Sequence, residues 1–467
     1  MLSASMNNIV SELASYVRQP VYRDAHNEPS DPEAHLQRFL FASMDEVRLR
    51  HAAAYTKLLL RCTDMDDADH FREGLLRREV SADIGYPRQR DHSGHTLYNY
   101  LLGWYFYSNS RLISESIHAD TALRGYGAGP LVFRSLWPFA SLLHDIGYLF
   151  EGSLEPLTTA IQHRHVGAGA QVAHDYFTHR FWMQCGIDSV YDRARIRELA
   201  RVSAPNFSNH SLAGVADSLR SLGDLEAIRS AIQDQVLDRL DMHRVLASLS
   251  SEGALPGDAF DVWELHYRVF GRPSMVERIR WLRSAFESLI REGVGLTGLR
   301  LLDHGICSGL LLLLYSTFFF RVYYGLGARP PVLAADVALW KRFRERQYES
   351  LWWFSGVLWG TSASALHNVQ QQPNAVGIAG HLGPLRIEED SLAYLGILVD
   401  CLQEWDRYNV SHESVIGGTL PLQGVDVELG RSEHSIVVDY HDQARARSVR
   451  ESLDVALSGW QDVVVVV

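Results

Sequence analysis

The sequence predicts a mainly helical protein, and three observations point to this fold class. Apolar residues recur at helical spacing in the N-terminal part, for example across LQRFLFASMDEVRLRHAAAYTKLLLRC at 36–62. Two strongly apolar segments, around 301–324 and 347–369, are too long for ordinary strands and are interpreted as buried helices. Strand-like patterns begin only after about residue 411. With 46% apolar and 21% charged residues, the composition is that of a folded globular chain.

The first part of the chain is predicted to consist of helices separated by turns. Residues 1–87 form a charged helical segment that ends at a glycine-proline turn. Asp91 occupies the expected N-cap position of a helix that continues through HSGHTLYNYLLGWYFY, residues 92–107. The apolar segment LWPFASLLHDIGYLF, residues 136–150, is predicted to be another helix, which Gly147 ends or bends.

The remainder is predicted to contain a helical insertion and a small α+β appendage. A helix is expected over 160–180, and amphipathic helices fill an insertion at about 185–295. A last apolar helix is predicted at 389–407. After it, VDVELGR, SIVVDYH and VVVVV are predicted strands, and DQARARSVRESLDVALSGW is a predicted helix. The predicted units are residues 1–87, 88–410 (which contain the insertion) and 411–467.

Charge and cysteine content narrow the function classes. The net charge of −12 argues against bulk binding of nucleic acid or of an anionic membrane, although a metal ion and local arginines could hold an anionic small substrate. The four cysteines form no C-x-x-C pair, which fits a reducing cytoplasm and argues against a zinc ribbon. The N-terminus lacks a signal-peptide pattern, and the apolar run at 310–320 is too short to span a bilayer. We therefore expect a cytoplasmic protein without membrane partners.

His144 and Asp145 are the most informative residues, because they lie together inside the apolar run from Leu136 to Phe150. A buried carboxylate costs several kcal/mol unless it is paired or bound to a metal. Adjacent His and Asp at a helix end can both bind one metal ion. Asp400 poses the same problem, as the charged residue of LAYLGILVDCL. For both carboxylates, an ion pair with a core arginine is the alternative interpretation.

Histidines in other apolar helices extend this pattern. His92, His95 and Asn99 share one helix face through their spacing, and His95 is favoured as a ligand because it lies deeper in the helix. His304 and His367 each stand at the end of a very apolar helix. Each histidine alone is more often structural. Together with the carboxylates, however, they predict a metal site.

In this order, His95, His144-Asp145 and Asp400 resemble the H…HD…D signature of the HD superfamily. The segments RDHSGHTLYNYLLG, LLHDIGY and LGILVDCLQEWDR are similar to its motif helices, and the resemblance spans about residues 88–410. The GYP motif of one branch is absent, since Gly85-Tyr86-Pro87 lies elsewhere.

The resemblance implies an HD-type helical bundle that hydrolyses phosphoesters, often of nucleotides, with one or two divalent ions (Mn, Mg, Fe, Co or Ni). It implies these metal ligands: His95, His144, Asp145, His304, His367 and Asp400. Asp145 would also be catalytic by bridging two ions, and His92 would protonate the leaving group. Arg88 and Arg90 are predicted to bind the substrate phosphates. Arg342, Arg344 and Arg346 are weaker candidates, because KRFRER is more typical of a solvated helix face.

Several alternatives stay open. His163 or His165, in a helix similar to the H-x-x-x-G-A helix of two-metal members, competes with His304 as a ligand. The ligand order also resembles that of inositol oxygenase, a di-iron enzyme of the same superfamily. A nucleotide-sensing scaffold without turnover is a further alternative, in which the insertion and the α+β appendage would serve regulation or assembly into a homo-oligomer.

Overall fold

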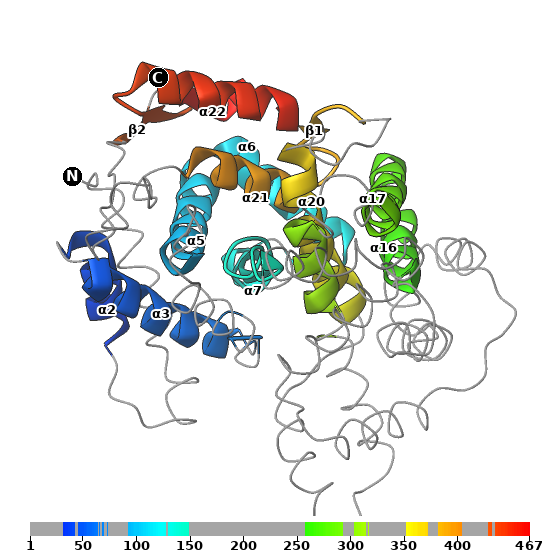
Figure 1. Cartoon of the computed structure of the whole chain (residues 1–467), viewed down its shortest axis with the longest axis horizontal. Helices are drawn as coiled ribbons and strands as arrows, with labels where there is room; N and C mark the ends of the chain where they lie inside the picture. The colour runs from blue at the N-terminus through cyan, green and yellow to red at the C-terminus, as the bar shows by residue number, and fades with distance from the viewer. Residues whose placement is uncertain are drawn as a thin grey trace, which may run out of the picture.

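The computed structural model describes the following parts of the chain: residues 31–42, 45–63, 65, 68–69, 72, 92–127, 129–148, 257–292, 303–313, 316, 352–371, 382–403, 428–431 and 435–467. These parts are mainly helical, as the sequence predicts (Figure 1). No helix among them is both long and apolar enough to cross a membrane. The boundaries of the three predicted units stay a prediction.

A group of helices surrounds α7 (Pro130–Ala140), which is seen end-on at the centre of Figure 1. Its neighbours are α5 (His92–Asn109), α20 (Leu358–Gln371) and α21 (Ser391–Leu402). Helix α5 is buried all round from its first residue to Tyr107, as expected of a helix at the centre of a domain. Helix α21 is equally apolar, and its Asp400 alone is not fully buried. The predicted buried helices therefore form the core.

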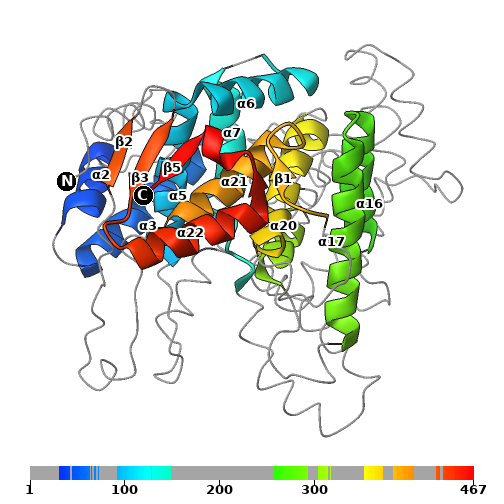
Figure 2. The same ribbon diagram turned by 90° about the horizontal axis from the view of Figure 1, so that it is seen from above.

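Further helices cover this core on its outer sides. The pair α2 (Pro32–Phe41) and α3 (Asp45–Cys62) packs on α5, and α6 (Arg111–Leu123) packs on α5 and α21. The pair α16 (Gly257–Val269) and α17 (Pro273–Glu292) lies beside α20, within the predicted helical insertion (Figure 2). A π-helix, η4 (Trp352–Val357), leads into α20.

Buried hydrogen bonds fix the N-terminus of α21 against its neighbours. The Asp390 carboxylate caps α21 and accepts hydrogen bonds from Trp359 Nε1 (2.9 Å) and the Tyr267 hydroxyl (2.5 Å). The Asp120 carboxylate on α6 accepts from the backbone N (3.0 Å) and the hydroxyl (2.6 Å) of Ser391. Because buried polar groups must find partners, these contacts set the positions of α6, α16, α20 and α21 relative to one another.

The C-terminal part forms the predicted strand-helix unit. Strands β2 (Glu428–Arg431) and β3 (Ile436–Asp439) are antiparallel, and β5 (Val464–Val466) joins β3 in parallel after the connecting helix α22 (Gln443–Ala456). The apolar face of α22 packs on α20 and α21. A short parallel pair, β1 (Leu385–Arg386) with β4 (Leu457–Ser458), then η7 (Trp460–Asp462), completes the unit.

The predicted end of one helix is wrong. The segment 136–150 does not continue as a helix to Gly147: α7 ends at Ala140, and residues 141–147 form a series of turns. Pro138 explains the early end, because a proline inside a helix cannot donate its backbone hydrogen bond. Next, the amide of Leu143 bonds the carbonyl of Pro138, five residues back, so the helix widens and stops. His144 and Asp145 therefore lie in a turn.

The buried ion pair of Arg278 and Glu389 gives a pH-dependent prediction. Arg278 Nη2 donates to Glu389 Oε2 at 3.0 Å, and both side chains are less than 10% exposed. Burial alone raises the pKa of Glu389, but the Arg386 amide and the Arg278 guanidinium outweigh it and hold the pKa below 4.5. The ionised carboxylate therefore stabilises the fold above pH 4.5, and this contribution is lost as the pH falls through the lowered pKa.

We expect Glu389→Gln to lower the free energy of unfolding by about 1–3 kcal/mol at pH 7. The difference from the parent protein should shrink as the pH falls from 4.5 through the lowered pKa, where the folded parent protein takes up the proton. Urea unfolding at pH 7 and at several values below pH 4.5 measures both effects. A difference that stays constant with pH would contradict the assigned role of the charge.

Candidate metal centre

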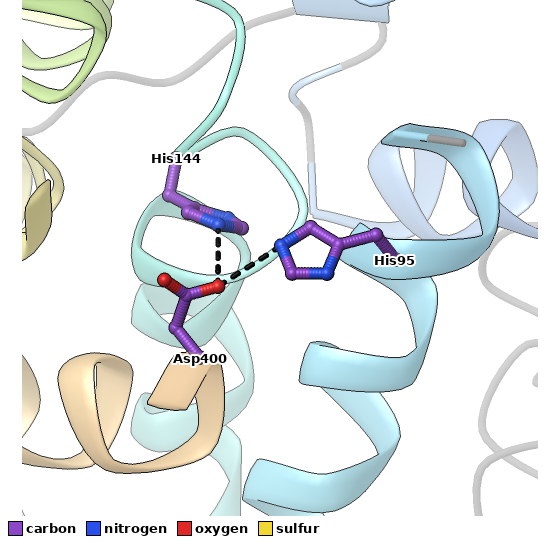
Figure 3. Close-up of side chains that lie close together, drawn as sticks. All are labelled: His95, His144 and Asp400. Carbon is purple, nitrogen blue, oxygen red and sulfur yellow. Dashed lines mark ion pairs between the residues drawn. The ribbon is translucent and has the colours of Figure 1, made fainter. Parts of the chain in front are cut away.

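Four helices and one turn bring the predicted ligands to a single place. His95 comes from α5, Asp400 from α21 and His144 from the turn after α7. Asp400 Oδ1 lies 2.9 Å from His95 Nε2 and 3.4 Å from His144 Nε2 (Figure 3). Their ligand atoms all lie within 4.8 Å of one another, a spacing at which they could hold one metal ion.

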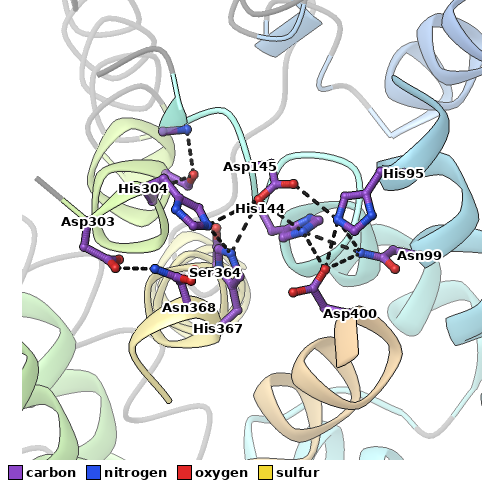
Figure 4. A network of polar contacts seen from close by, with 12 residues as sticks. His95, Asn99, His144, Asp145, Asp303, His304, Ser364, His367, Asn368 and Asp400 are labelled. Atoms are coloured by element: carbon purple, nitrogen blue, oxygen red, sulfur yellow. Dashed lines mark hydrogen bonds and ion pairs between the residues drawn. The ribbon is translucent and has the colours of Figure 1, made fainter. Parts of the chain in front are cut away.

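A second group of ligand atoms adjoins the first and shares His144 with it. Asp145 Oδ1 lies 3.4 Å from His144 Nε2, 3.5 Å from His367 Nε2 on α20 and 3.6 Å from His304 Nε2. His304 is the first residue of the helical stretch 304–313. The other oxygen of Asp145 lies 3.3 Å from His95 Nε2, so Asp145 contacts both groups (Figure 4). All predicted metal ligands are thus brought together.

The centre is buried, and its charges shift one another's pKa values. The side chains of its histidines and of Asp145 are at most 7% exposed, whereas Asp400 is 13% exposed. Burial alone would lower the pKa of His144, but Asp145 and Asp400 raise it to about 9. Burial opposes ionisation of both carboxylates, yet the neighbouring histidines hold their pKa values well below the usual range. The carboxylates are therefore ionised at neutral pH.

The outer nitrogen of three of the histidines contacts an oxygen atom outside the centre. The carbonyl of Ser141 lies 2.5 Å from His144 Nδ1, and that of Ser364 lies 2.6 Å from His367 Nδ1. His95 Nδ1 lies 2.5 Å from the amide oxygen of Gln403. Because these oxygens accept, Nδ1 carries the proton in each neutral ring, and the lone pair of Nε2 faces the centre.

The imidazole nitrogens and carboxylate oxygens of the centre lie close together. A positive charge among them is needed to offset their repulsion. His367 Nε2 and His304 Nε2 lie 3.2 Å apart, and one carboxylate oxygen, Asp145 Oδ1, lies beside both. Lone pairs so close repel unless a proton or a metal ion stands among them. Histidines whose Nδ1 bonds a carbonyl and whose Nε2 faces a carboxylate are typical of metal ligands in proteins. The residues present therefore fit a divalent metal.

A close backbone approach holds the turn against the helical stretch 304–313. Gly147 N donates to Ser308 Oγ at 2.7 Å, and a Cβ atom at position 147 would lie 1.9 Å from the His304 carbonyl oxygen. The neighbouring ring of Tyr148 stacks on His304, with 3.8 Å between ring centroids, and packs against His92 at 4.5 Å. Tyr148 thus connects His92 to the centre.

The amide side chains of this centre have no role predicted from the sequence. Asn99 Nδ2 donates to Asp400 Oδ1 at 3.0 Å, and the signal for it was its place one helical turn after His95. Gln403 follows Asp400 by three residues, again about one turn. Asn368 donates to Asp303, whose other oxygen caps the helical stretch that begins at His304.

Other predicted residues lie outside the described part of the chain. These are the proposed phosphate-binding Arg88 and Arg90, the competing ligands His163 and His165, the predicted cap Asp91, and Arg342, Arg344 and Arg346. Their predicted roles stay predictions. His92 is described, and its nearest described ring is that of Tyr148 rather than a ligand's.

No family model, curated protein or solved structure matches the chain. The centre is therefore interpreted from its own geometry.

Proposed function

We propose that the chain is a metal-dependent phosphohydrolase of the HD type, which cleaves a phosphoester of a nucleotide. The observation that carries this proposal is the convergence of four imidazole Nε2 atoms on two ionised carboxylates in a buried centre. The order of His95, His144-Asp145 and Asp400 along the chain, H…HD…D, adds support through its resemblance to the signature of the superfamily.

Different residues of the chain would have different roles in such a site. His95, His144 and Asp400 would hold one ion, and Asp145 with His304 and His367 would hold a second. When bound, the ions would acidify a water molecule and neutralise phosphate oxygens. The carbonyls of Ser141 and Ser364, which bond the outer ring nitrogens, would keep the histidines turned inward.

Proton delivery and phosphate binding are assigned to residues at the start of α5. His92 lies one turn before His95, and its contact with Tyr148 places it at the edge of the centre. We assign it the protonation of the leaving oxygen. Arg88 and Arg90 precede α5 by a few residues, and we assign them the substrate phosphates, which guanidinium groups bind through paired hydrogen bonds.

The types of ligand atom also narrow the choice of metal ion. Four imidazoles with two carboxylates favour Fe, Co, Ni, Zn or Mn over Mg²⁺, which prefers oxygen ligands and retains its water. We expect the purified protein to hold about two transition-metal ions per chain, and Mn²⁺ or Co²⁺ to restore activity after chelation where Mg²⁺ does not.

The test combines metal analysis with a substrate panel. Metal-free protein is loaded with Mn²⁺, Co²⁺, Fe²⁺ or Mg²⁺ and mixed with (deoxy)nucleoside phosphates and cyclic nucleotides, and product release is followed. Phosphate or nucleoside release that depends on a transition metal supports the proposal. Metal binding without turnover of any nucleotide would contradict it; tight nucleotide binding in that case would favour the sensing scaffold.

A di-iron oxygenase is the second candidate, because the same ligand order fits it and because His304 and His367 make the centre rich in nitrogen. Its signature would be a coloured protein that consumes O₂ in the presence of iron and a reduced organic substrate. Hydrolysis under anaerobic conditions would exclude O₂ as a reactant and decide in favour of the phosphohydrolase.

A further inference from the structure

We infer that Asn99 is a further ligand of the first metal ion, alongside His95, His144 and Asp400. This inference rests on the proposed metal centre but not on the identity of its substrate. Asn99 lies on α5 one helical turn after His95, and only 1% of its surface is exposed. Its side-chain amide therefore points into the protein on the same face as a predicted ligand.

The amide group occupies the position of a fourth donor. Its Nδ2 atom lies 3.0 Å from Asp400 Oδ1, 3.4 Å from His95 Nε2 and 3.5 Å from His144 Nε2. Donors that surround one ion tetrahedrally at about 2.1 Å lie roughly 3.4 Å from one another. The separations of Asn99 from His95 and His144 match this value, and so does the 3.4 Å between His144 and Asp400. Asp400 Oδ1 lies closer than this to both Asn99, at 3.0 Å, and His95, at 2.9 Å. Figure 4 shows the Asn99 amide beside these side chains.

The Asn99 amide could act as a hydrogen-bond donor without an ion and as an oxygen ligand with one. In the structure the NH₂ group donates to Asp400 Oδ1, and Asn99 Oδ1 is buried with no hydrogen-bond partner among the described residues. Without a metal, the NH₂ group thus supplies part of the positive charge that the Asp400 carboxylate requires. A cation among the same atoms would repel those hydrogens and attract the amide oxygen, so a half-turn about the Cβ–Cγ bond would present Oδ1 as a neutral ligand.

Gln403 provides a matched contrast. Its amide oxygen contacts His95 Nδ1, the ring nitrogen that faces away from the other ligands, so Gln403 acts on the ion only through His95. A true ligand and a positioning residue should therefore differ in what they do to the spectrum of the bound ion.

The experiment uses Co²⁺, whose visible absorption reports the number and type of its ligands. Full-length metal-free protein, Asn99→Leu, Asn99→Asp and Gln403→Met are titrated with Co²⁺, and thermal unfolding checks that each variant is folded. We expect Asn99→Leu to weaken binding by about 10–100-fold and to change the spectrum at saturation. Gln403→Met should weaken binding within the same range and leave the saturated spectrum as in the parent protein.

Asn99→Asp supplies a charged oxygen in the same place and is expected to bind Co²⁺ more tightly than the parent protein. This variant decides the matter if Asn99→Leu fails to fold. A saturated Asn99→Leu spectrum identical to that of the parent protein, or an unchanged Co²⁺ affinity in Asn99→Asp, would overturn the inference. Co²⁺ binding with the expected differences but without any nucleotide hydrolysis would instead refute the proposed function and leave Asn99 a ligand.

Discussion

Asp145→Asn is expected to remove the bound metal and to reduce hydrolysis to the level of the metal-free protein. One oxygen of Asp145 faces His144, His304 and His367, and the other faces His95, at 3.3–3.6 Å. Asparagine keeps the shape but loses the negative charge shared by both groups of ligands. Since loss of a residue that merely orients a ligand costs about 10–100-fold in affinity or activity, loss of this carboxylate should cost more.

Asp390→Asn is the matched control for this substitution. Asp390 is also a fully buried carboxylate, and it caps α21, the helix that carries Asp400. Asparagine is as good an N-cap as aspartate, and its one oxygen can still accept from Trp359 and Ala393. Its NH₂ group would face the Tyr267 hydroxyl, which can accept from it and donate to Ser362 instead. Metal analysis and hydrolysis should show the parent values for Asp390→Asn. An Asp145→Asn protein that keeps its metal would place the centre elsewhere.

Gly147→Ala is expected to damage the centre without replacing any ligand side chain. A Cβ atom here would lie 1.9 Å from the carbonyl oxygen of His304 and 2.7 Å from the backbone N of Ser308, and neither backbone atom can turn aside. The turn that carries His144 and Asp145 must therefore move away from the helical stretch 304–313 by about 1 Å. Such a displacement can reduce a rate by about 100-fold, and the strain should cost about 1–3 kcal/mol of stability.

Thermal unfolding, metal content and hydrolysis rate measure the effect of Gly147→Ala. Gly127→Ala serves as the control, because Gly127 lies between α6 and α7 with no atom near the added methyl group. The control should unfold at or slightly above the parent temperature, since alanine reduces the freedom of the unfolded chain. Parent-like stability and metal content in Gly147→Ala would show that the turn and the helix need not be so close.

The side chains of the candidate centre could be predicted because burial of a charge leaves few explanations. Asp400 stands among apolar residues of α21, and His144 and Asp145 stand in an apolar segment, so each needed a partner. The mainly helical core could be predicted from apolar residues that recur at helical spacing. It is enough to know which residues cannot be buried without a partner. The atoms that contact one another need not be known.

The amide partners of the centre could not be predicted from the sequence in this way. Gln403 lies 308 positions from His95, with which it is in contact, and glutamine at a helix end is ordinary on a protein surface. The turn around His144 was missed for a different reason. The residues at 136–150 are apolar throughout, so the apolar pattern does not show where the helix ends. Only Pro138 indicated that the helix ends early.

The attachment of the C-terminal unit has a consequence for synthesis of the protein. Strand β4 pairs with β1 next to α21, the Tyr440 hydroxyl bonds the carbonyl of Leu402, and Gln370 donates to the carbonyl of Ala456. These contacts tie the helices that carry His367 and Asp400 to residues that the ribosome makes after them. At about 5–20 residues per second, Asp400 follows His144 by roughly 13–50 seconds. The nascent chain therefore contains the histidines long before Asp400 is added, and the candidate centre is complete only after Asp400 and the C-terminal unit that packs on its helix have been made.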